Sequence, residues 1–264
     1  MKEHRKPSLK VAERNEGLLV AIRAIKADHP FWGYRRVWAY LTYREGKKVN
    51  RKRVYRVMQQ AKDLLVKPGE KRLARRGPFR AKPRPKRPNQ WWGIDMTKVL
   101  LGNWGWIYAV VVLDWYTKKV VGYYLGFQAK ACHWREALEQ GVAKQFPEGI
   151  EGHNVHLMSD NGCQPTSVSF MKACRSLNIE QAFTCYNNPK GNADTERFMR
   201  TFKEELVWSR DWQDPFEFAQ AATKWFETYN REYLHSSLEY RTPEAFEKQF
   251  YDERREQKPL TLVA

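Results

Sequence analysis

The chain has 264 residues, of which 47 are lysine or arginine and 30 are aspartate or glutamate, giving a formal net charge of +17. No apolar run is long enough to span a bilayer, and the N-terminus has no secretory leader pattern, so we expect a cytoplasmic protein without membrane segments. The four cysteines form no CxxC pair, which argues against a structural zinc site and favours reduced thiols. The large positive charge indicates a polyanionic partner.

The positive charge is concentrated in the first third of the chain. Residues 1–66 carry 17 basic and 6 acidic side chains, residues 67–90 carry 10 and 1, and residues 91–264 carry 20 and 23. This distribution is typical of a nucleic-acid-binding module joined to a nearly neutral domain. A membrane surface is the weaker alternative, because prolines interrupt the most basic stretch and prevent an amphipathic helix.

In chain order, residues 1–15 are polar and basic and are expected to be flexible. Residues 16–66 then predict three short helices, at about 16–29, 35–43 and 51–63, from the spacing of their apolar residues. Asn50 is a predicted N-cap of the third helix. A basic third helix in such a set resembles a helix-turn-helix module, whereas a small helical bundle with solvated cations is the alternative.

Cationic side chains gather on the second and third predicted helices. Those on the third helix crowd its first turns, where they oppose the helix macrodipole, so we interpret them as serving a phosphate partner and not stability. The candidate DNA-contacting residues of this module are Arg35, Arg36, Arg51, Lys52, Arg53 and Arg56.

Residues 67–90 contain five prolines and ten cations, a composition that cannot form a packed element. We predict an extended linker that follows a phosphate backbone, with a bland spacer as the alternative. The candidate contacts in this linker are Arg72, Arg75, Arg76 and Arg80.

From residue 91 the pattern changes to strands. Three runs with turn residues between them predict an antiparallel meander, and helices and strands then alternate. The predicted elements are strands at 91–100, 104–114, 118–127, 154–159 and 181–185 and helices at 132–145, 167–177, from 193 and at 216–229. This order is that of an RNase H-like α+β/α/β core with a mixed five-stranded sheet. We place this domain at residues 91–250 and a frayed tail at 251–264.

The stretch Asn188–Leu206 predicts a helix that carries function. Pro189 and Gly191 mark a turn, and Asn192 is a predicted N-cap. The helical spacing places one carboxylate and two cations on an exposed edge, namely Glu196, Arg200 and Lys203. The opposite, buried face is predicted to consist of Phe198, Phe202 and Leu206.

Three carboxylates stand at positions that suit metal ligands. Asp95 lies within a predicted strand, Asp160 at the end of another, and Glu196 in the first turn of the helix, with 35 residues between the last two. Such oxygen ligands suit Mg²⁺, and a pair of these cations can clamp the attacking and leaving oxygens of a phosphoryl transfer. With 30 acidic residues, chance alone produces some such triplet. Asp114, at the end of the second strand, is a rival carboxylate.

Several segments, in this order, resemble DDE transposases of the retroviral-integrase superfamily, and most closely the OrfB half of two-frame insertion-sequence transposases. The matching segments are WGYRRVWAYL, VNRKRVYRVM, NQWWGIDMT, VVVLDWYTKKVVGY, SDNG, NNPKGNADTERFMRTFKEEL and YNREYLHSSLEYRTPEAF. They span roughly residues 30 to 250. Departures occur at Cys163 and Pro165 after SDNG, and at Thr195 and Arg197 beside Glu196.

The resemblance implies a DNA transposase that cleaves insertion-sequence ends and joins them to target DNA. It implies two Mg²⁺ or Mn²⁺ ions held by Asp95, Asp160 and Glu196, and contact between Lys203 and terminal DNA, with Arg200 on the same edge. It also implies that Asp114 is a structural turn residue and not a catalytic one. The implied partners are double-stranded DNA of the element ends and target, other copies of the chain, and an upstream-frame protein. A nucleoid-associated location follows from DNA binding.

Two alternatives remain open at this point. A catalytically silent DNA-binding regulator would share the basic first third, but it would not need carboxylates at all three positions. A structure-selective nuclease of the same fold would share the carboxylates, whereas the long basic arm favours a protein that binds element ends.

Overall fold

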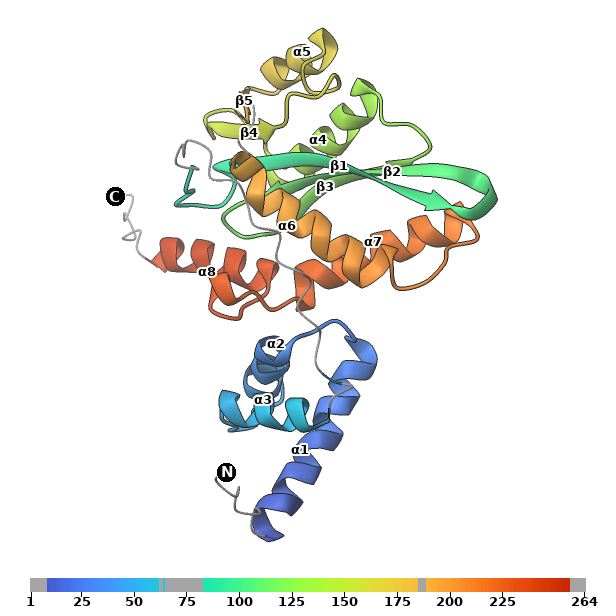
Figure 1. Ribbon diagram of the computed structural model, residues 1–264. Helices are drawn as coiled ribbons and strands as arrows, with labels where there is room; N and C mark the ends of the chain where they lie inside the picture. The colour runs from blue at the N-terminus through green and yellow to red at the C-terminus, as the bar shows by residue number, and fades with distance from the viewer. Residues whose placement is uncertain (1–8, 62–63, 65–82, 185–188, 257–264) are drawn as a thin grey trace, which may run out of the picture. The chain divides into compact units, whose positions relative to one another are not determined.

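The computed structural model describes residues 9–61, 64, 83–184 and 189–256 (Figure 1). The chain divides into two compact units. The first runs to Leu73 and includes Leu234–Tyr240, and the second holds Ala74–Tyr233 and Arg241–Ala264. The segment Leu234–Tyr240 therefore groups with the first unit, although it falls inside the predicted catalytic domain at residues 91–250. Most of the predicted linker, including Arg72, Arg75, Arg76 and Arg80, lies outside the described residues.

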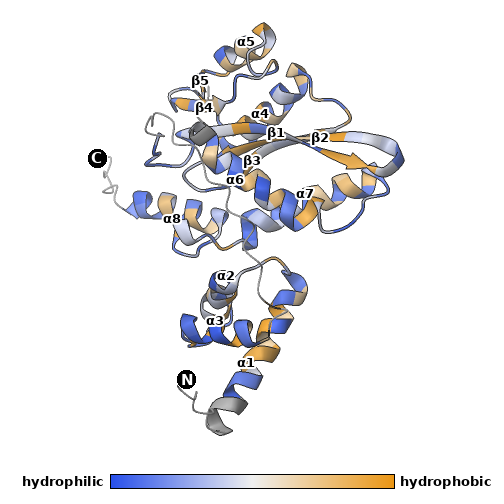
Figure 2. Cartoon of the chain, viewed as in Figure 1, coloured by the Kyte–Doolittle hydropathy of each residue, from blue (hydrophilic) through white to orange (hydrophobic). Residues whose placement is uncertain are grey.

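The first unit is built from helices. Its elements are α1 (Leu9–Asp28), α2 (Tyr34–Ala39), which continues into a π-helical turn (Tyr40–Arg44), and α3 (Arg51–Gln60). Their apolar faces form one core of fully or nearly fully buried side chains, among them Ile22, Trp32, Val37, Leu41, Val54 and Met58. The opposite face of α3 is polar, and Figure 2 shows this helix largely in hydrophilic colours. These helices match the predicted three-helix module.

Two local predictions for this unit have different outcomes. The Asn50 side chain accepts a hydrogen bond from the Lys52 backbone N–H at 2.8 Å, so the predicted N-cap of α3 is confirmed. The flexible N-terminus predicted at 1–15 is wrong from Leu9 onward, because α1 begins there. Tertiary packing of the α1 stripe around Ile22 stabilises a helix longer than its polar first turns predict.

The second unit contains the predicted five-stranded mixed sheet. Its strands are β1 (Trp91–Leu101), β2 (Gly105–Asp114), β3 (Val120–Gly126), β4 (Val155–Ser159) and β5 (Ile179–Phe183). The spatial order is β3-β2-β1-β4-β5, in which β1 pairs antiparallel with β2 and parallel with β4. The antiparallel meander followed by parallel strands confirms the RNase H-like core.

Helices cover both faces of this sheet (Figure 1). On one face α4 (Ala131–Gln145) and α5 (Val168–Ser176) contribute Trp134, Leu138 and Phe170 to a core shared with the sheet. On the other face lie α6 (Ala193–Phe202), which continues into a π-helical turn (Lys203–Val207), and α7 (Pro215–Glu232). The sheet is therefore buried on both sides, as a sheet with parallel strands requires.

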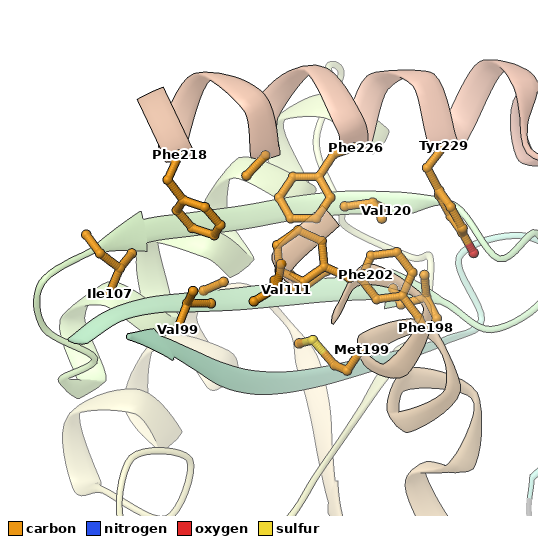
Figure 3. Close-up of a cluster of buried hydrophobic side chains, with 14 of the residues drawn as sticks. Val99, Ile107, Val111, Val120, Phe198, Met199, Phe202, Phe218, Phe226 and Tyr229 are labelled. Atoms are coloured by element: carbon orange, nitrogen blue, oxygen red, sulfur yellow. The ribbon is translucent and has the colours of Figure 1, made fainter. Parts of the chain in front are cut away.

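The core beneath α6 and α7 is rich in aromatic rings. Figure 3 shows Phe198 and Phe202 of α6 and Phe226 of α7 packed against Val111 and Val120 of the sheet. Phe198 and Phe202 are thus buried as predicted, while Leu206 is only partly buried. Met199, which the sequence prediction did not include, is also buried in this cluster. Truncating any of these aromatic side chains to alanine would cost about 3–5 kcal/mol.

The C-terminal helix α8 (Pro243–Glu256) extends past the predicted end of the domain. A frayed tail from residue 251 is therefore wrong as far as Glu256. The helix is attached to the sheet by an ion pair between Lys119 Nζ and Glu247 Oε2 at 2.5 Å, and Phe246 and Phe250 contact the Tyr116 ring. These contacts stabilise a helix whose charged sequence alone predicts fraying.

Two further observations bear on the composition-based expectations. Cys132, Cys163 and Cys174 are free thiols, and Cys174 is buried. Among the described residues, no helix combines the length and apolar character needed to cross a lipid bilayer.

Candidate active site

Asp95 lies in the middle of β1, and strand alternation fixes the direction of its side chain. Trp92 and Ile94 of β1 belong to the core beneath α4, whereas Val99 and Leu101 belong to the core beneath α6 and α7. Successive side chains of a strand point to opposite faces, so Asp95 points to the face that α6 covers.

Asp160 follows β4 immediately, and the strand register places it beside Asp95. The parallel pairing of β1 and β4 aligns Gly93 with Met158, and two further residues along each strand are Asp95 and Asp160. Met158 belongs to the core beneath α6, so Asp160, two residues on, continues on the same face. Its Oδ1 accepts a hydrogen bond from the Gly162 N–H at 3.0 Å, which holds the carboxylate at the start of the turn.

Glu196 occupies the first turn of α6, and a close helix–strand approach brings that turn over β1. A Cβ added to Gly93 would overlap the Thr195 hydroxyl and the Trp115 indole nitrogen, and it would lie 2.8 Å from Asn192 Oδ1. Only glycine therefore lets the start of α6 approach the strand this closely. Thr195 directly precedes Glu196, and Gly93 lies two residues before Asp95. The close approach of α6 to β1 therefore places Glu196 near Asp95.

The pKa of Asp95 is affected by the charges of the other two carboxylates. The pKa of Asp95 is raised to about 6, with burial as the largest cause and with the charges of Asp160 and Glu196 acting in the same direction. A hydrogen bond from the Met96 N–H, at 2.8 Å, and the positive charge of Lys203 lower the pKa. Three acidic groups and one cation thus interact at the place where β1, β4 and α6 meet.

The helix edge predicted from sequence is present in part. Glu196 and Arg200 are exposed, and Lys203 is half-buried within electrostatic reach of Asp95. The Arg200 Nε donates to Glu204 Oε1 at 2.7 Å, so this guanidinium has an intrahelical partner. Of the two cations on this edge, Lys203 is the one whose positive charge acts on Asp95.

Asn192 was predicted to cap α6, and that prediction is wrong in its hydrogen bond. The residue stands at the N-cap position, but its side chain caps no backbone N–H of the helix. Instead, Asn192 Nδ2 donates to the Ile94 carbonyl of β1 at 3.3 Å, and the side chain is buried. The amide thus ties the start of the helix to the strand, a long-range partner that local sequence signals cannot reveal.

Asp114 is a buried turn residue, as interpreted from the sequence. Its carboxylate accepts hydrogen bonds from the backbone N–H groups of Asn89, Tyr116 and Thr117, at 2.5, 2.6 and 2.9 Å. Burial raises the pKa of Asp114 to about 6 even against these three bonds. Its oxygens are occupied by the backbone, which leaves them poorly placed for a metal.

The residues fit a divalent cation by chemistry and charge. Three clustered carboxylates repel one another, and a hard cation with oxygen ligands relieves that repulsion. Across the part of the chain that the structure describes, no three histidine, cysteine, aspartate or glutamate side chains are gathered closely enough to enclose a metal ion. Asp160 and Glu196 are both exposed, so packing does not enclose either carboxylate.

The predicted DNA-contacting cations of the first unit differ in exposure. Arg35, Arg51, Lys52 and Arg56 are exposed. Arg53 Nε donates to Asn15 Oδ1 of α1 at 2.9 Å, and the Arg36 guanidinium lies over the Trp32 ring at 5.6 Å from its centroid. Arg36 and Arg53 therefore contribute to packing within the unit, which the sequence pattern did not distinguish.

Comparison with protein families divides the chain in the same way as its fold. An HTH-like domain model matches residues 13–68, and two integrase core domain models match residues 85–189 and 177–243. The fold and these matches define a helix-turn-helix module with an RNase H-like integrase core.

Sequence relatives make the assignment specific. The transposase for insertion sequence element IS904 of Lactococcus lactis subsp. lactis is 30% identical over 258 residues, covering 93% of this chain and 98% of that protein. Transposase InsD of the Escherichia coli IS2 elements is 26% identical over 88% of this chain and 78% of its own length. The catalytic core domain of BIV integrase aligns with a TM-score of 0.46 at 18% identity, over 64% of this chain and 98% of its own. The chain belongs to the insertion-sequence transposase family, and it is a DNA-binding DDE transposase.

Proposed function

We propose that Asp95, Asp160 and Glu196 are the metal-binding carboxylates of this transposase and that they bind two divalent cations, Mg²⁺ or Mn²⁺. The observation that carries the proposal is the convergence of the three carboxylates: the register of β1 with β4 places Asp160 beside Asp95, and the start of α6 lies directly over Gly93 of β1. The HTLV-2 integrase catalytic core, a protein of related fold, has been solved in complex with magnesium.

When bound, the cations would activate an attacking oxygen and neutralise charge on the leaving oxygen of a phosphodiester. Asp95 supplies a rigid oxygen ligand from mid-strand, while Asp160 and Glu196 supply ligands that can adjust. Water attacks first and frees a 3′-hydroxyl at the element end. That hydroxyl then attacks a target phosphodiester, in line with the bond that breaks.

We further propose which cations bind DNA. The position of Lys203 beside the carboxylates suits contact with the phosphate next to the cleaved bond, and Arg200 lies on the same edge. The exposed Arg35, Arg51, Lys52 and Arg56 suit phosphates further along the element end, with Arg36 and Arg53 as supporting members of the same surface. Arg72, Arg75, Arg76 and Arg80 of the linker complete the proposed contacts.

The assembly is also a proposal. Joining two element ends to one target requires two active sites, so we propose that the chain acts as a homo-oligomer on double-stranded DNA. An upstream-frame protein is a further proposed partner, and the location is nucleoid-associated as a consequence of DNA binding.

The test is incubation of the full chain with labelled element-end DNA and Mg²⁺, scoring nicked ends and joined products separately. We expect both products with Mg²⁺ or Mn²⁺ and neither with EDTA or Ca²⁺. A matched DNA of scrambled end sequence controls for nonspecific nuclease activity. Metal-dependent nicking of both DNAs without joined product would favour a nuclease, and binding without any product would favour a silent regulator.

A further inference from the structure

The first turn of α6 is held to the sheet by polar contacts on three residues that lead up to Glu196. Trp115 Nε1 donates to Thr195 Oγ1 at 3.0 Å, and both side chains are buried. Lys118 Nζ forms an ion pair with Asp194 Oδ2 at 3.2 Å. Asn192 donates to the Ile94 carbonyl, as described above.

These contacts join residues adjacent to two proposed ligands. Thr195 directly precedes Glu196 on α6, and Ile94 directly precedes Asp95 on β1. Trp115 begins the turn that connects β2 to β3. Its indole N–H bonds to Thr195, which lies 80 residues further along the chain. Together with the apolar packing of Phe198 and Phe202, these contacts fix the distance between the backbones that carry Asp95 and Glu196.

The chemistry of the contact is unusual for ordinary helix–sheet packing. The surrounding core consists of aromatic and aliphatic side chains, whereas the space over Gly93 contains an indole N–H, a hydroxyl and an amide. Asn192 Oδ1 is buried and accepts no hydrogen bond from the described residues. Buried polar groups are costly unless they are paired, and here the indole N–H and the Thr195 hydroxyl are paired with each other.

We propose that Trp115 and Thr195 are positioning residues for the metal site, through the indole-to-hydroxyl hydrogen bond over Gly93. The inference rests on the proposed roles of Asp95 and Glu196. The bond fixes the rotation and height of the first α6 turn, and so decides whether Glu196 can share a cation with Asp95. Outer contacts of this kind typically change metal affinity by about 10- to 100-fold when removed.

The test compares Thr195→Val, which keeps the side-chain shape and removes the acceptor, with Thr195→Ser, which keeps the acceptor. Mn²⁺ binding to the full chain is measured from the electron paramagnetic resonance signal of free Mn²⁺, and cleavage is measured against Mg²⁺ concentration. We expect Thr195→Val to weaken Mn²⁺ binding and raise the half-maximal Mg²⁺ concentration by about 10-fold. Thr195→Ser should stay within about 2-fold of wild type, because the hydroxyl still accepts the bond.

Thr242→Val is the matched control. The Thr242 hydroxyl is also buried and accepts one N–H, that of Ala245 in α8. Its loss should lower the thermal midpoint by a few degrees, as is also expected for Thr195→Val, while Mn²⁺ binding stays at the wild-type level. Equal loss of Mn²⁺ binding in both variants would show that general destabilisation is responsible and would overturn the proposal.

Two further outcomes are distinguishable. Should Thr195→Val fail to fold, Trp115→Phe removes the donor, together with part of a buried ring, and is expected to weaken Mn²⁺ binding in the same way. Normal Mn²⁺ binding by the folded variant, alongside lost binding in Asp95→Asn, overturns the positioning inference alone. Normal Mn²⁺ binding by Asp95→Asn would instead overturn the proposed metal site.

Discussion

Asp95 and Asp114 lie on neighbouring strands, and burial raises the pKa of each to about 6. Their surroundings differ. Asp114 is fully enclosed and accepts three backbone hydrogen bonds, whereas Asp95 accepts one and faces two other carboxylates. One aspartate organises a turn, and the other belongs to a cluster with excess negative charge.

The different surroundings of Asp95 and Asp114 show how a raised carboxyl pKa should be interpreted. Burial is the largest cause at both residues and the resulting pKa is the same, so the shift does not by itself identify a metal ligand. What separates them is the source of the remaining interactions, because backbone N–H groups satisfy Asp114 within the protein. Asp95 instead interacts with the charges of Asp160, Glu196 and Lys203, which is the setting expected of the proposed cation site.

The largest expected effect comes from the carboxylate cluster. Asp95→Asn, Asp160→Asn and Glu196→Gln should each reduce strand cleavage below detection, because each removes a charged metal ligand. Element-end binding should stay within a few fold, measured by electrophoretic mobility shift at fixed salt. A variant that cleaves at the wild-type rate in Mg²⁺ would remove its residue from the proposed site.

Asp114→Asn should instead reduce stability. An amide has one acceptor oxygen for three backbone donors, and its NH₂ group would face at least one of them, so unfolding should become easier by about 1–3 kcal/mol. Cleavage per folded molecule should be largely retained. The measurements are urea unfolding and cleavage of the same preparation below its midpoint. A fully folded but inactive Asp114→Asn would break the distinction between the two aspartates.

Without metal, Asp95→Asn is expected to increase the stability of the protein, whereas Asp114→Asn is expected to decrease it. A raised pKa means that the folded state holds the Asp95 proton more tightly than the unfolded state does. Its stabilising contribution is complete below about pH 4 and is lost as the pH rises through about 6, and ionisation then opposes folding by at most about 3 kcal/mol. In EDTA near pH 8, Asp95→Asn should therefore be more stable than wild type, by about 1–3 kcal/mol.

The check is urea unfolding in EDTA at both ends of that pH window. The advantage of Asp95→Asn should shrink near pH 4.5, where the wild-type carboxyl is protonated in the folded state. A variant that is less stable than wild type at both pH values would mean that the carboxylate contributes favourable bonds, as Asp114 does.

The smallest expected stability change belongs to Lys203→Ala. The side chain is half-buried near the carboxylates, and its removal should change stability by no more than about 0.5 kcal/mol. End-specific cleavage should fall much further than nonspecific DNA binding, if Lys203 contacts terminal DNA. Arg135→Ala, at an exposed residue of α4 that is likewise paired with a glutamate one turn on, Glu139, is the matched control. Unchanged cleavage by Lys203→Ala would leave this lysine without the proposed contact.

The sequence by itself determined the elements that depend on local pattern. Alternation and turn residues located the strands to within a few residues, and helical spacing located α4, α5 and α6. The Asn50 cap was predictable, because its partner is two residues away. The sequence also predicted the elements that carry Asp95, Asp160 and Glu196, because a strand, a strand end and a helix start are local features.

Features that depend on contacts between residues far apart in the sequence became apparent only in the tertiary structure. Parallel pairing of β1 with β4 aligns Asp95 with Asp160, and no local signal fixes that register. The extent of α8 depends on the pairing of Glu247 with Lys119, which is 128 residues away. Asn192 bonds to β1 and not to its own helix, and Gly93 is required because α6 lies directly over it. Local propensity cannot anticipate these contacts, because their free energy comes from groups that only the folded chain brings together.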